Sequence, residues 1–405
     1  MRVALVHYWL LGSRGGEKVL EAICRIFPEA DIFTLFYEPD AVPALIRSKN
    51  VQASFLNPFR KVYRSLLPLM PLALEAFDLR PYDLVISSES GPAKGVITSA
   101  TTHHICYCHT PMRYLWELYP AYFSDFGRGR FARALLAPFA SYLRMWDYAT
   151  AARVDDFVAN SQNVKHRVWK TYRRKAKVVY PPVPVDTFFH SPSEDYFLIV
   201  SEMVAYKRLN YAIRLFARNG RKLKVVGDGP EYSALKRLAA PHIEFCGRVP
   251  ERQLRDLYAR SSALLVPGEE DFGMTMVESL ASGKPVVALG AGGALEIVAN
   301  GCGVLYAEPT ETCLEDALRF FDRIRSLVNP EDLRRRAEEF SEAAFDRRFR
   351  AVLARYWSQN NERRHPLTVV GPARTAVKPA WPRNDENNGS ETSLGRRLTD
   401  AGDAI

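Results

Sequence analysis

The sequence predicts an α/β protein built from two Rossmann-like domains, and three observations support this fold class. The chain has 405 residues, which is two to three times a usual domain length of about 150. Short apolar runs alternate with amphipathic segments in two separate series, a pattern typical of βαβ units around parallel sheets. The series are separated at residues 180–184, Tyr-Pro-Pro-Val-Pro, where the prolines impose an extended connector.

The first domain is expected over residues 1–180. Residues 17–27 are amphipathic and predict a helix. The runs around this segment are short and apolar, as expected for buried strands of a parallel sheet. These strands are expected at residues 3–7, 31–35, 84–87 and 104–108.

The second domain is expected over residues 181–340, with helical segments between its strands. A C-terminal helix is expected over residues 341–358, and it could cross back to the first domain. After about Tyr356 the chain is rich in Ser, Asn, Arg, Pro and Gly, so residues 359–405 are expected to form a disordered tail. The strands of the second domain are expected at residues 197–201, 223–226, 243–246, 263–266 and 285–289.

The amino-acid composition limits the classes of protein to which the chain can belong. Hydrophobic residues make up 47% and charged residues 25% of the chain, as in ordinary globular proteins. No run approaches the roughly 20 apolar residues that a membrane span needs, and no signal-peptide pattern opens the chain. The six cysteines show no metal-site spacing. We therefore expect a cytoplasmic protein without a transmembrane anchor, a zinc site or a disulfide framework.

The charge balance leaves several partner classes open. Lys and Arg outnumber Asp and Glu by 55 to 46, for a net charge of +9. Such a modest excess suits nucleic acid, an anionic membrane face or a phosphate-bearing substrate. The basic residues belong to no recognised nucleic-acid-binding module, so no nucleic-acid partner is expected.

Two carboxylates follow a predicted strand of the second domain. Glu270 and Glu278 come after the run at residues 263–266 and a Pro-Gly turn. If a helix begins near Phe272, Glu270 lies in the preceding loop and Glu278 about two turns inside the helix, whose N-terminal amides open toward a ligand cleft. One carboxylate could bind a sugar hydroxyl and the other a ribose. The spacing alone also fits an acidic helix start and a solvated glutamate.

A glycine-rich loop follows the next predicted strand. Residues 290–296 read Gly-Ala-Gly-Gly-Ala-Leu-Glu, and such a loop can bring backbone amides close to a phosphate. Leu295 occupies the sixth position of a GxGxxG pattern, where the dinucleotide fingerprint needs a small residue. A nicotinamide enzyme is therefore disfavoured, and the loop could equally be a simple turn.

Taken together and in order, these motifs resemble the donor half of the retaining family 4 glycosyltransferases of the GT-B fold. The N-terminal half is similar to a branch typified by bacterial mannosyltransferases of O-antigen and exopolysaccharide assembly. The resemblance covers about residues 1–350 and implies two parallel sheets that face each other across a cleft. The motifs that carry it lie at residues 6–10, 15–20, 108–116, 160–161, 179–183, 226–230, 270–278 and 292–296.

The resemblance implies a role for each matching residue. Glu270 would contact hydroxyls of the donor sugar, Glu278 would hold the nucleotide ribose, and Lys207 would neutralise the donor diphosphate. His109 would reach the sugar from the first domain. The residues implied as catalytic are Glu270, His109 and Lys207, and those implied in donor binding are Gly15, Gly16, Lys207, Arg208, Gly227, Asp228, Glu270, Phe272, Gly273, Met274 and Glu278.

One position departs from the family pattern. The family usually carries an arginine shortly before the lysine that matches Lys207, whereas this chain has Glu202 there. A carboxylate beside a diphosphate would repel it, and losing one charge-assisted contact could reduce binding or rate roughly tenfold to a hundredfold. Either Arg208 substitutes, the donor differs, or activity is weak.

The resemblance also implies the chemistry. Fixed cations and helix N-terminal amides would stabilise the leaving nucleoside diphosphate without a metal or cofactor, and the anomeric configuration would be retained. Hydrolysis by paired carboxylates would instead need two groups that flank the glycosidic bond. The branch implies GDP-mannose as donor. UDP-glucose, UDP-galactose or a catalytically impaired sugar-nucleotide-binding subunit remain alternatives.

The acceptor side is expected to lie near a membrane. Residues 57–67 and 126–136 mix cations with aromatic and aliphatic residues. Such segments suit attachment to the cytoplasmic membrane face, close to a glycan linked to polyprenyl diphosphate. Ordinary helices with solvated arginines and a core-facing stripe would show the same composition.

Overall fold

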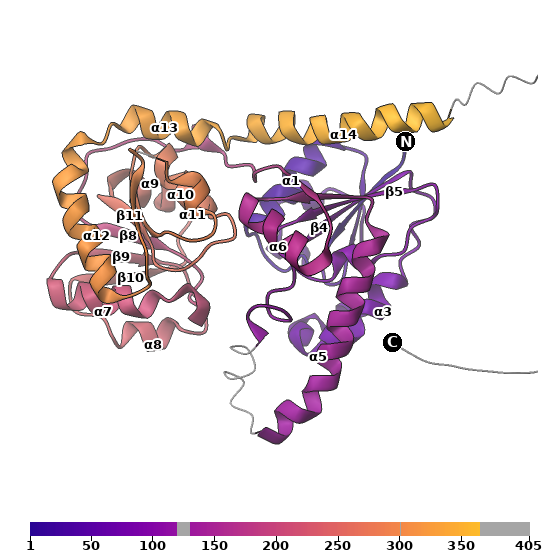
Figure 1. Cartoon of the computed structure of the whole chain (residues 1–405), viewed down its shortest axis with the longest axis horizontal. Helices are drawn as coiled ribbons and strands as arrows, with labels where there is room; N and C mark the ends of the chain where they lie inside the picture. Colours follow the sequence, from indigo (N-terminus) through magenta and orange to yellow (C-terminus); the bar gives the residue numbers. More distant parts are fainter. Residues whose placement is uncertain (120–129, 300, 365–405) are drawn as a thin grey trace, which may run out of the picture. The chain divides into compact units, whose positions relative to one another are not determined.

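The computed structural model describes residues 1–119, 130–299 and 301–364. Residues Met1–Trp357 form one compact unit, which holds two parallel sheets. Figure 1 shows each sheet flanked by helices on both faces. The predicted α/β class with two Rossmann-like halves is confirmed.

The first sheet has seven parallel strands in the order β3-β2-β1-β4-β5-β6-β7. The strand order reverses between β1 and β4, and at such a switch point the loops after the two strands diverge and leave a crevice. Strands β3, β6 and β7 were not among the expected segments. The bounds are β1 (Val3–His7), β2 (Asp31–Thr34), β3 (Val51–Ala53), β4 (Leu84–Glu89), β5 (His103–Cys108), β6 (Asp156–Ala159) and β7 (Ala176–Val178).

The second sheet has six parallel strands in the order β10-β9-β8-β11-β12-β13. Its switch point lies between β8 and β11, which pair directly. The last strand, β13, was not among the expected segments. The bounds are β8 (Phe197–Val200), β9 (Leu223–Val226), β10 (Ile243–Gly247), β11 (Ala263–Val266), β12 (Val286–Leu289) and β13 (Gly303–Tyr306).

Helices connect the strands, as right-handed βαβ crossovers require. Two 3-10 segments are used below, η2 (Asn57–Leu69) and η6 (Ala205–Lys207). The α-helices are α1 (Gly15–Ile26), α2 (Ala44–Arg47), α3 (Met70–Glu75), α5 (Arg130–Thr150), α6 (Gln162–Tyr172), α7 (Leu209–Asn219), α8 (Tyr232–Lys236), α9 (Glu251–Arg260), α10 (Met274–Ala281), α11 (Ala294–Ile297), α12 (Glu311–Ile324), α13 (Pro330–Glu338) and α14 (Glu342–Arg364).

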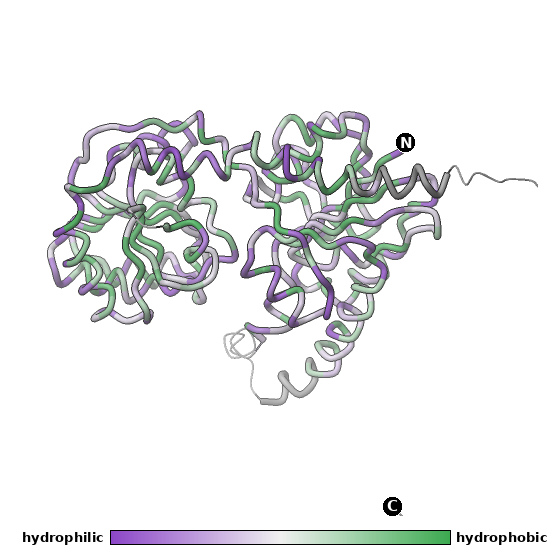
Figure 2. The backbone as a smooth tube through the Cα atoms, turned by 45° about the horizontal axis from the view of Figure 1, so that its top comes forward, coloured by the Kyte–Doolittle hydropathy of each residue, from purple (hydrophilic) through white to green (hydrophobic). Residues whose placement is uncertain are grey.

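The strands are buried on both faces because helices cover both sides of each sheet. In the first half, Leu5 and Ile86 lie in one core cluster, while Val6 and Val85 lie in another, as the two-residue period of strands requires. The first of these clusters also contains Phe349 of α14. Figure 2 shows hydrophobic segments along the central strands. This burial holds the strand ends, and therefore the loops after them, in fixed positions.

Candidate functional site

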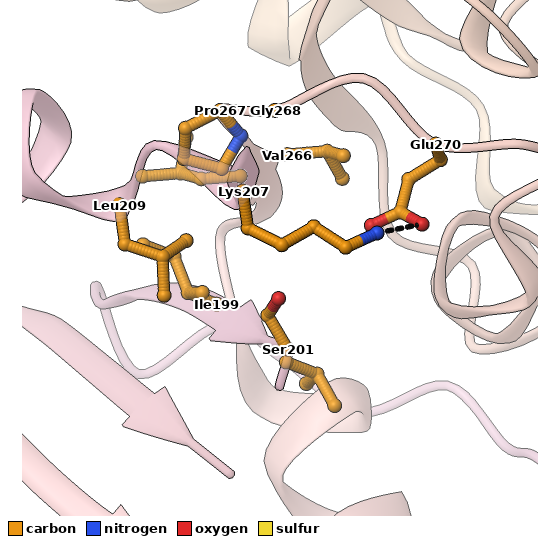
Figure 3. Close-up of a pocket in the computed structure, with 10 residues that line it drawn as sticks. Ile199, Ser201, Lys207, Leu209, Val266, Pro267, Gly268 and Glu270 are labelled. Atoms are coloured by element: carbon orange, nitrogen blue, oxygen red, sulfur yellow. Dashed lines mark ion pairs between the residues drawn. The ribbon is translucent and has the colours of Figure 1, made fainter. Parts of the chain in front are cut away.

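A lysine and a glutamate meet at the switch point of the second sheet. Lys207 ends η6, in the connection that follows β8, and Glu270 follows β11. The Lys207 ammonium forms an ion pair with Glu270 Oε2, as Figure 3 shows. The pair borders a small pocket lined by Ile199, Val200, Ser201, Lys207, Leu209, Leu265, Val266, Pro267, Gly268 and Glu270. A cation and a carboxylate thus lie where open parallel sheets bind ligands.

The charge of Lys207 is maintained by its partner. The side chain of Lys207 is 13% exposed and that of Glu270 is 20% exposed. Burial by itself would lower the pKa of the Lys207 ammonium, but the Glu270 carboxylate, together with Tyr206 and Asp271, outweighs burial and raises that pKa above its usual value. Lys207 therefore stays positively charged at neutral pH.

Closely packed backbone segments hold the loops around the Lys207–Glu270 pair in place. A Cβ atom at Gly268 would lie 2.5 Å from the carbonyl oxygen of Lys207, which only glycine avoids. At Gly227, φ is +129° and a Cβ would lie 1.9 Å from the carbonyl oxygen of Ser201. The loop after β9 therefore packs directly on the loop after β8. The neighbouring Asp228 is exposed and accepts a hydrogen bond from the amide of Gly229 at 2.8 Å.

Glu278 lies in the second turn of α10, which begins at Met274, two residues after Phe272. Its carboxylate is buried and has two partners. The Tyr258 hydroxyl donates to Oε2 at 2.9 Å, and Lys18 Nζ of α1 lies 3.3 Å from Oε1. The Glu278 carboxylate raises the pKa of Lys18 against the effect of burial. The carboxylate implied in ribose binding is thus held by a cation from the other half of the chain.

His109 follows β5 in the first half. Its Nε2 atom lies 2.9 Å from Ser88 Oγ at the end of β4. Burial, reinforced by the neighbouring His7, lowers the pKa of His109 to about 3. The imidazole is therefore neutral at physiological pH and can exchange hydrogen bonds but carries no charge.

The Gly15-Gly16 pair lies between residues of both halves. A Cβ at Gly16 would lie 3.6 Å from His109 Nε2, and a Cβ at Gly15 would lie 3.1 Å from Met274 Sδ at the start of α10. The start of α1 therefore adjoins His109 on one side and α10 on the other. Gly15, Gly16 and His109 of the first half thus lie beside the helix that carries Glu278.

Three further predicted residues have different surroundings. The Phe272 side chain is buried in the core and stacks on Tyr180 with ring centroids 5.5 Å apart. Gly273, with φ of +97°, forms the N-cap of α10. Arg208 is exposed and has a left-handed backbone. The Phe272 side chain packs in the core, whereas Gly273 and Arg208 lie at the starts of helices.

Polar contacts that the sequence did not indicate join the two halves beside Glu270. The Asp271 carboxylate pairs with Arg167 and lies 3.4 Å from Arg113 Nη1. Glu296 of α11 accepts hydrogen bonds from the amides of residues 162 and 163 at 2.8 and 3.0 Å, at the N-terminus of α6. No local pattern could have revealed these contacts, because each joins residues more than 100 positions apart.

Comparison with known proteins identifies the family. The model of Glycosyltransferase Family 4 matches residues 14–187, and that of Glycosyl transferases group 1 matches residues 187–343. The chain belongs to the family 4 glycosyltransferases of the GT-B fold. Both the predicted family and the predicted GT-B architecture are confirmed.

Solved structures share the fold of this glycosyltransferase. Sucrose-phosphate synthase from Thermosynechococcus elongatus superposes with a TM-score of 0.66 at 14% identity, covering 89% of this chain and all of that one. Anabaena HepE in complex with UDP has a TM-score of 0.62 at 16% identity, covering 87% of this chain and all of HepE. At these identities the likeness shows the fold alone.

Curated relatives of the glycosyltransferase match over part of their length. An uncharacterized glycosyltransferase of Methanocaldococcus jannaschii is 29% identical over 46% of this chain and 53% of that protein. The O-antigen chain mannosyltransferase RfbU of Salmonella typhimurium is 25% identical over 46% of this chain and 57% of its own. A GDP-mannose-dependent alpha-mannosyltransferase of Mycolicibacterium smegmatis is 35% identical over 25% of this chain and 27% of its own. The chain therefore spans about half or less of these relatives.

Two structural features concern metal binding and membrane insertion. Within residues 1–119, 130–299 and 301–364, His, Cys, Asp and Glu side chains form no group that could hold a metal ion. In the same part of the glycosyltransferase, no helix is long and apolar enough to cross a bilayer. Metal independence remains a prediction.

Proposed function

We propose that the protein transfers mannose from GDP-mannose to a lipid-linked glycan in surface-polysaccharide assembly, with retention of anomeric configuration and without a metal. The Lys207–Glu270 pair at the switch point, opposite Gly15-Gly16 and His109, carries the proposal. The mannosyltransferase relatives from Mycolicibacterium and Salmonella support the choice of sugar.

The proposed reaction breaks the bond between the anomeric carbon and the diphosphate oxygen. Negative charge develops on the leaving phosphate, and positive charge develops on the sugar ring. Lys207 and the amides at the start of α10 would stabilise the leaving group, while Glu270 would bind sugar hydroxyls. The acceptor hydroxyl would attack from the side of the leaving group, and its proton would pass to the departing phosphate.

His109 would act as a neutral hydrogen-bonding group in this scheme. With a pKa of about 3, it carries no charge that could offset the diphosphate. It can donate to, or accept from, a sugar hydroxyl while Ser88 holds its ring at 2.9 Å. We therefore propose that His109 orients the sugar, and that Lys207 and the amides at the start of α10 stabilise the leaving group without it.

The proposed acceptor is a glycan on polyprenyl diphosphate at the cytoplasmic face of a membrane. Segment η2 exposes Phe59 and Val62, each more than half accessible, next to the exposed Lys61. Exposed apolar side chains beside a cation suit an anionic lipid surface. The second segment indicated by the sequence, residues 126–136, lies outside the residues whose side chains are described. Failure of the protein to pellet with anionic vesicles at low salt would count against this part.

A panel of nucleotide sugars tests the donor. GDP-mannose is expected to raise the unfolding temperature most and to release GDP in step with glycolipid formation in the presence of membranes. Turnover with UDP-glucose or UDP-galactose instead would replace the donor and keep the reaction class. Glu202 favours a second candidate, an impaired sugar-nucleotide-binding subunit, which donor binding without any turnover would support.

A further inference from the structure

The N-terminal end of α1 presents two cations to carboxylates of the other half. Arg14 directly precedes α1, and its Nη1 atom lies 3.3 Å from Glu202 Oε2. Lys18, four residues later in the first turn of α1, lies 3.3 Å from Glu278 Oε1. Glu202 directly follows Ser201, which lines the pocket around Lys207. Arg14, from the first half of the chain, therefore pairs with the residue next to a serine that lines this pocket.

Resting on the proposed nucleotide-sugar donor, we propose that Arg14 neutralises Glu202 and donates its remaining guanidinium N–H groups to the donor diphosphate. Arg14 would thus supply from the first half the second phosphate-binding cation, opposite Lys207. Glu202 would then be a positioning residue that holds the guanidinium at the pocket, rather than a group that repels the donor.

The chemistry of the guanidinium permits both contacts together. The contact with Glu202 involves Nη1, and an arginine side chain carries five N–H donors in a planar fork that fits carboxylate and phosphate oxygens. The Arg14 side chain is 57% exposed and that of Glu202 is 39% exposed. An incoming diphosphate can therefore reach the unused donors without displacing Glu202.

The backbone at Arg14 is held in place. The Arg14 amide donates to Glu17 Oε2 at 2.9 Å, at the start of α1. The two glycines that follow are closely packed. A Cβ at Gly15 would contact Met274, and a Cβ at Gly16 would contact Tyr8 and His109. Because this end of α1 packs against residues of both halves, the backbone of Arg14 is held in place. The Arg14 side chain therefore loses less conformational entropy on binding phosphate.

Calorimetric titration of the full chain with GDP and with UDP tests the inference. Arg14→Ala is expected to weaken binding of the preferred nucleotide about tenfold or more, because a charge-assisted contact is lost and Glu202 is left unpaired. The dependence of binding on salt should also become shallower. Adding Glu202→Gln to Arg14→Ala should restore at least threefold of the lost affinity by removing the orphaned carboxylate. The charge exchange R14E/E202R should bind within threefold of the unmodified protein.

Arg25→Ala is the matched control. Arg25 lies in the last turn of the same helix, pairs with Glu342 at 2.8 Å and is 52% exposed, so its loss should leave nucleotide affinity unchanged. If the unmodified protein binds nucleotide and Arg14→Ala stays within twofold of it, the role of Arg14 is refuted while the donor proposal stands. If Arg14→Ala loses affinity that adding Glu202→Gln does not restore, the unpaired carboxylate does not repel the nucleotide, and the neutralisation of Glu202 by Arg14 is refuted. If Glu202→Gln alone, with Arg14 intact, leaves nucleotide affinity unchanged, the positioning role of Glu202 is refuted. If the unmodified protein binds no nucleoside diphosphate, the proposed donor fails and Arg14 with it.

Discussion

Replacing Lys207 by methionine separates a role in ligand binding from a role in folding. The change keeps an apolar stem and removes the ammonium that pairs with Glu270. A charge-assisted contact to the diphosphate contributes about 1.5–3 kcal/mol, so GDP affinity should fall roughly tenfold to 150-fold. The orphaned Glu270 carboxylate is only 20% exposed, so the free energy of unfolding should fall by about 1–3 kcal/mol.

The double variant Lys207→Met/Glu270→Gln distinguishes the two effects. It removes the orphaned carboxylate, so urea unfolding should show most of the lost stability restored. Calorimetry should show GDP affinity still below that of the unmodified protein, because the cation is missing even though the orphaned carboxylate is gone. Equal GDP affinity in Lys207→Met and the unmodified protein would refute the assignment of this lysine to the diphosphate. Full recovery of the unmodified affinity in the double variant would show that the single change acted through the orphaned Glu270 carboxylate or through folding, and not through loss of a phosphate contact.

Three other changes test neighbouring parts of the site. Gly16→Ala would place a methyl group 2.7 Å from the Tyr8 hydroxyl, so turnover should fall at least tenfold. Gly12→Ala is the control: nothing lies within 4 Å of its Cβ, so its turnover should equal that of the unmodified protein. Tyr258→Phe removes the hydroxyl that donates to the Glu278 carboxylate. Donor affinity should fall, and the free energy of unfolding should decrease by about 1 kcal/mol. Unaltered donor affinity would exclude the Glu278 carboxylate from donor binding. Because the folded pKa of His109 is about 3, below the unfolded value of about 6.5, the unfolded chain binds the extra proton and stability should fall as pH drops from 6.5 toward 3. His109→Asn should remove up to about 2 kcal/mol of the difference between unfolding at pH 7 and at pH 5, and an unchanged pH profile would contradict a neutral, partly buried imidazole at this position.

Much of the fold could be predicted from local patterns. The apolar run at residues 263–266 and the glycine after Ser282 mark a strand and a helix end through side-chain periodicity and glycine conformation, which depend on near neighbours in the chain. Strands β3, β6, β7 and β13 were not predicted. Three of them, β3, β7 and β13, lie at the edges of the two sheets, and β3 and β7 have only three residues each. Runs this short carry too little periodicity to be recognised.

The α/β class, the family and the chain order of the carboxylates, glycines and cations follow from residue types at short spacing, so they could be predicted from the amino-acid sequence. Which charges face one another depends on how the chain folds. Glu278 pairs with Lys18, 260 positions away, and Glu202 with Arg14, 188 positions away. The physical reason is that strand order and helix packing, rather than distance along the chain, bring these groups together. The position of one charged residue in the sequence therefore does not indicate which residue neutralises it.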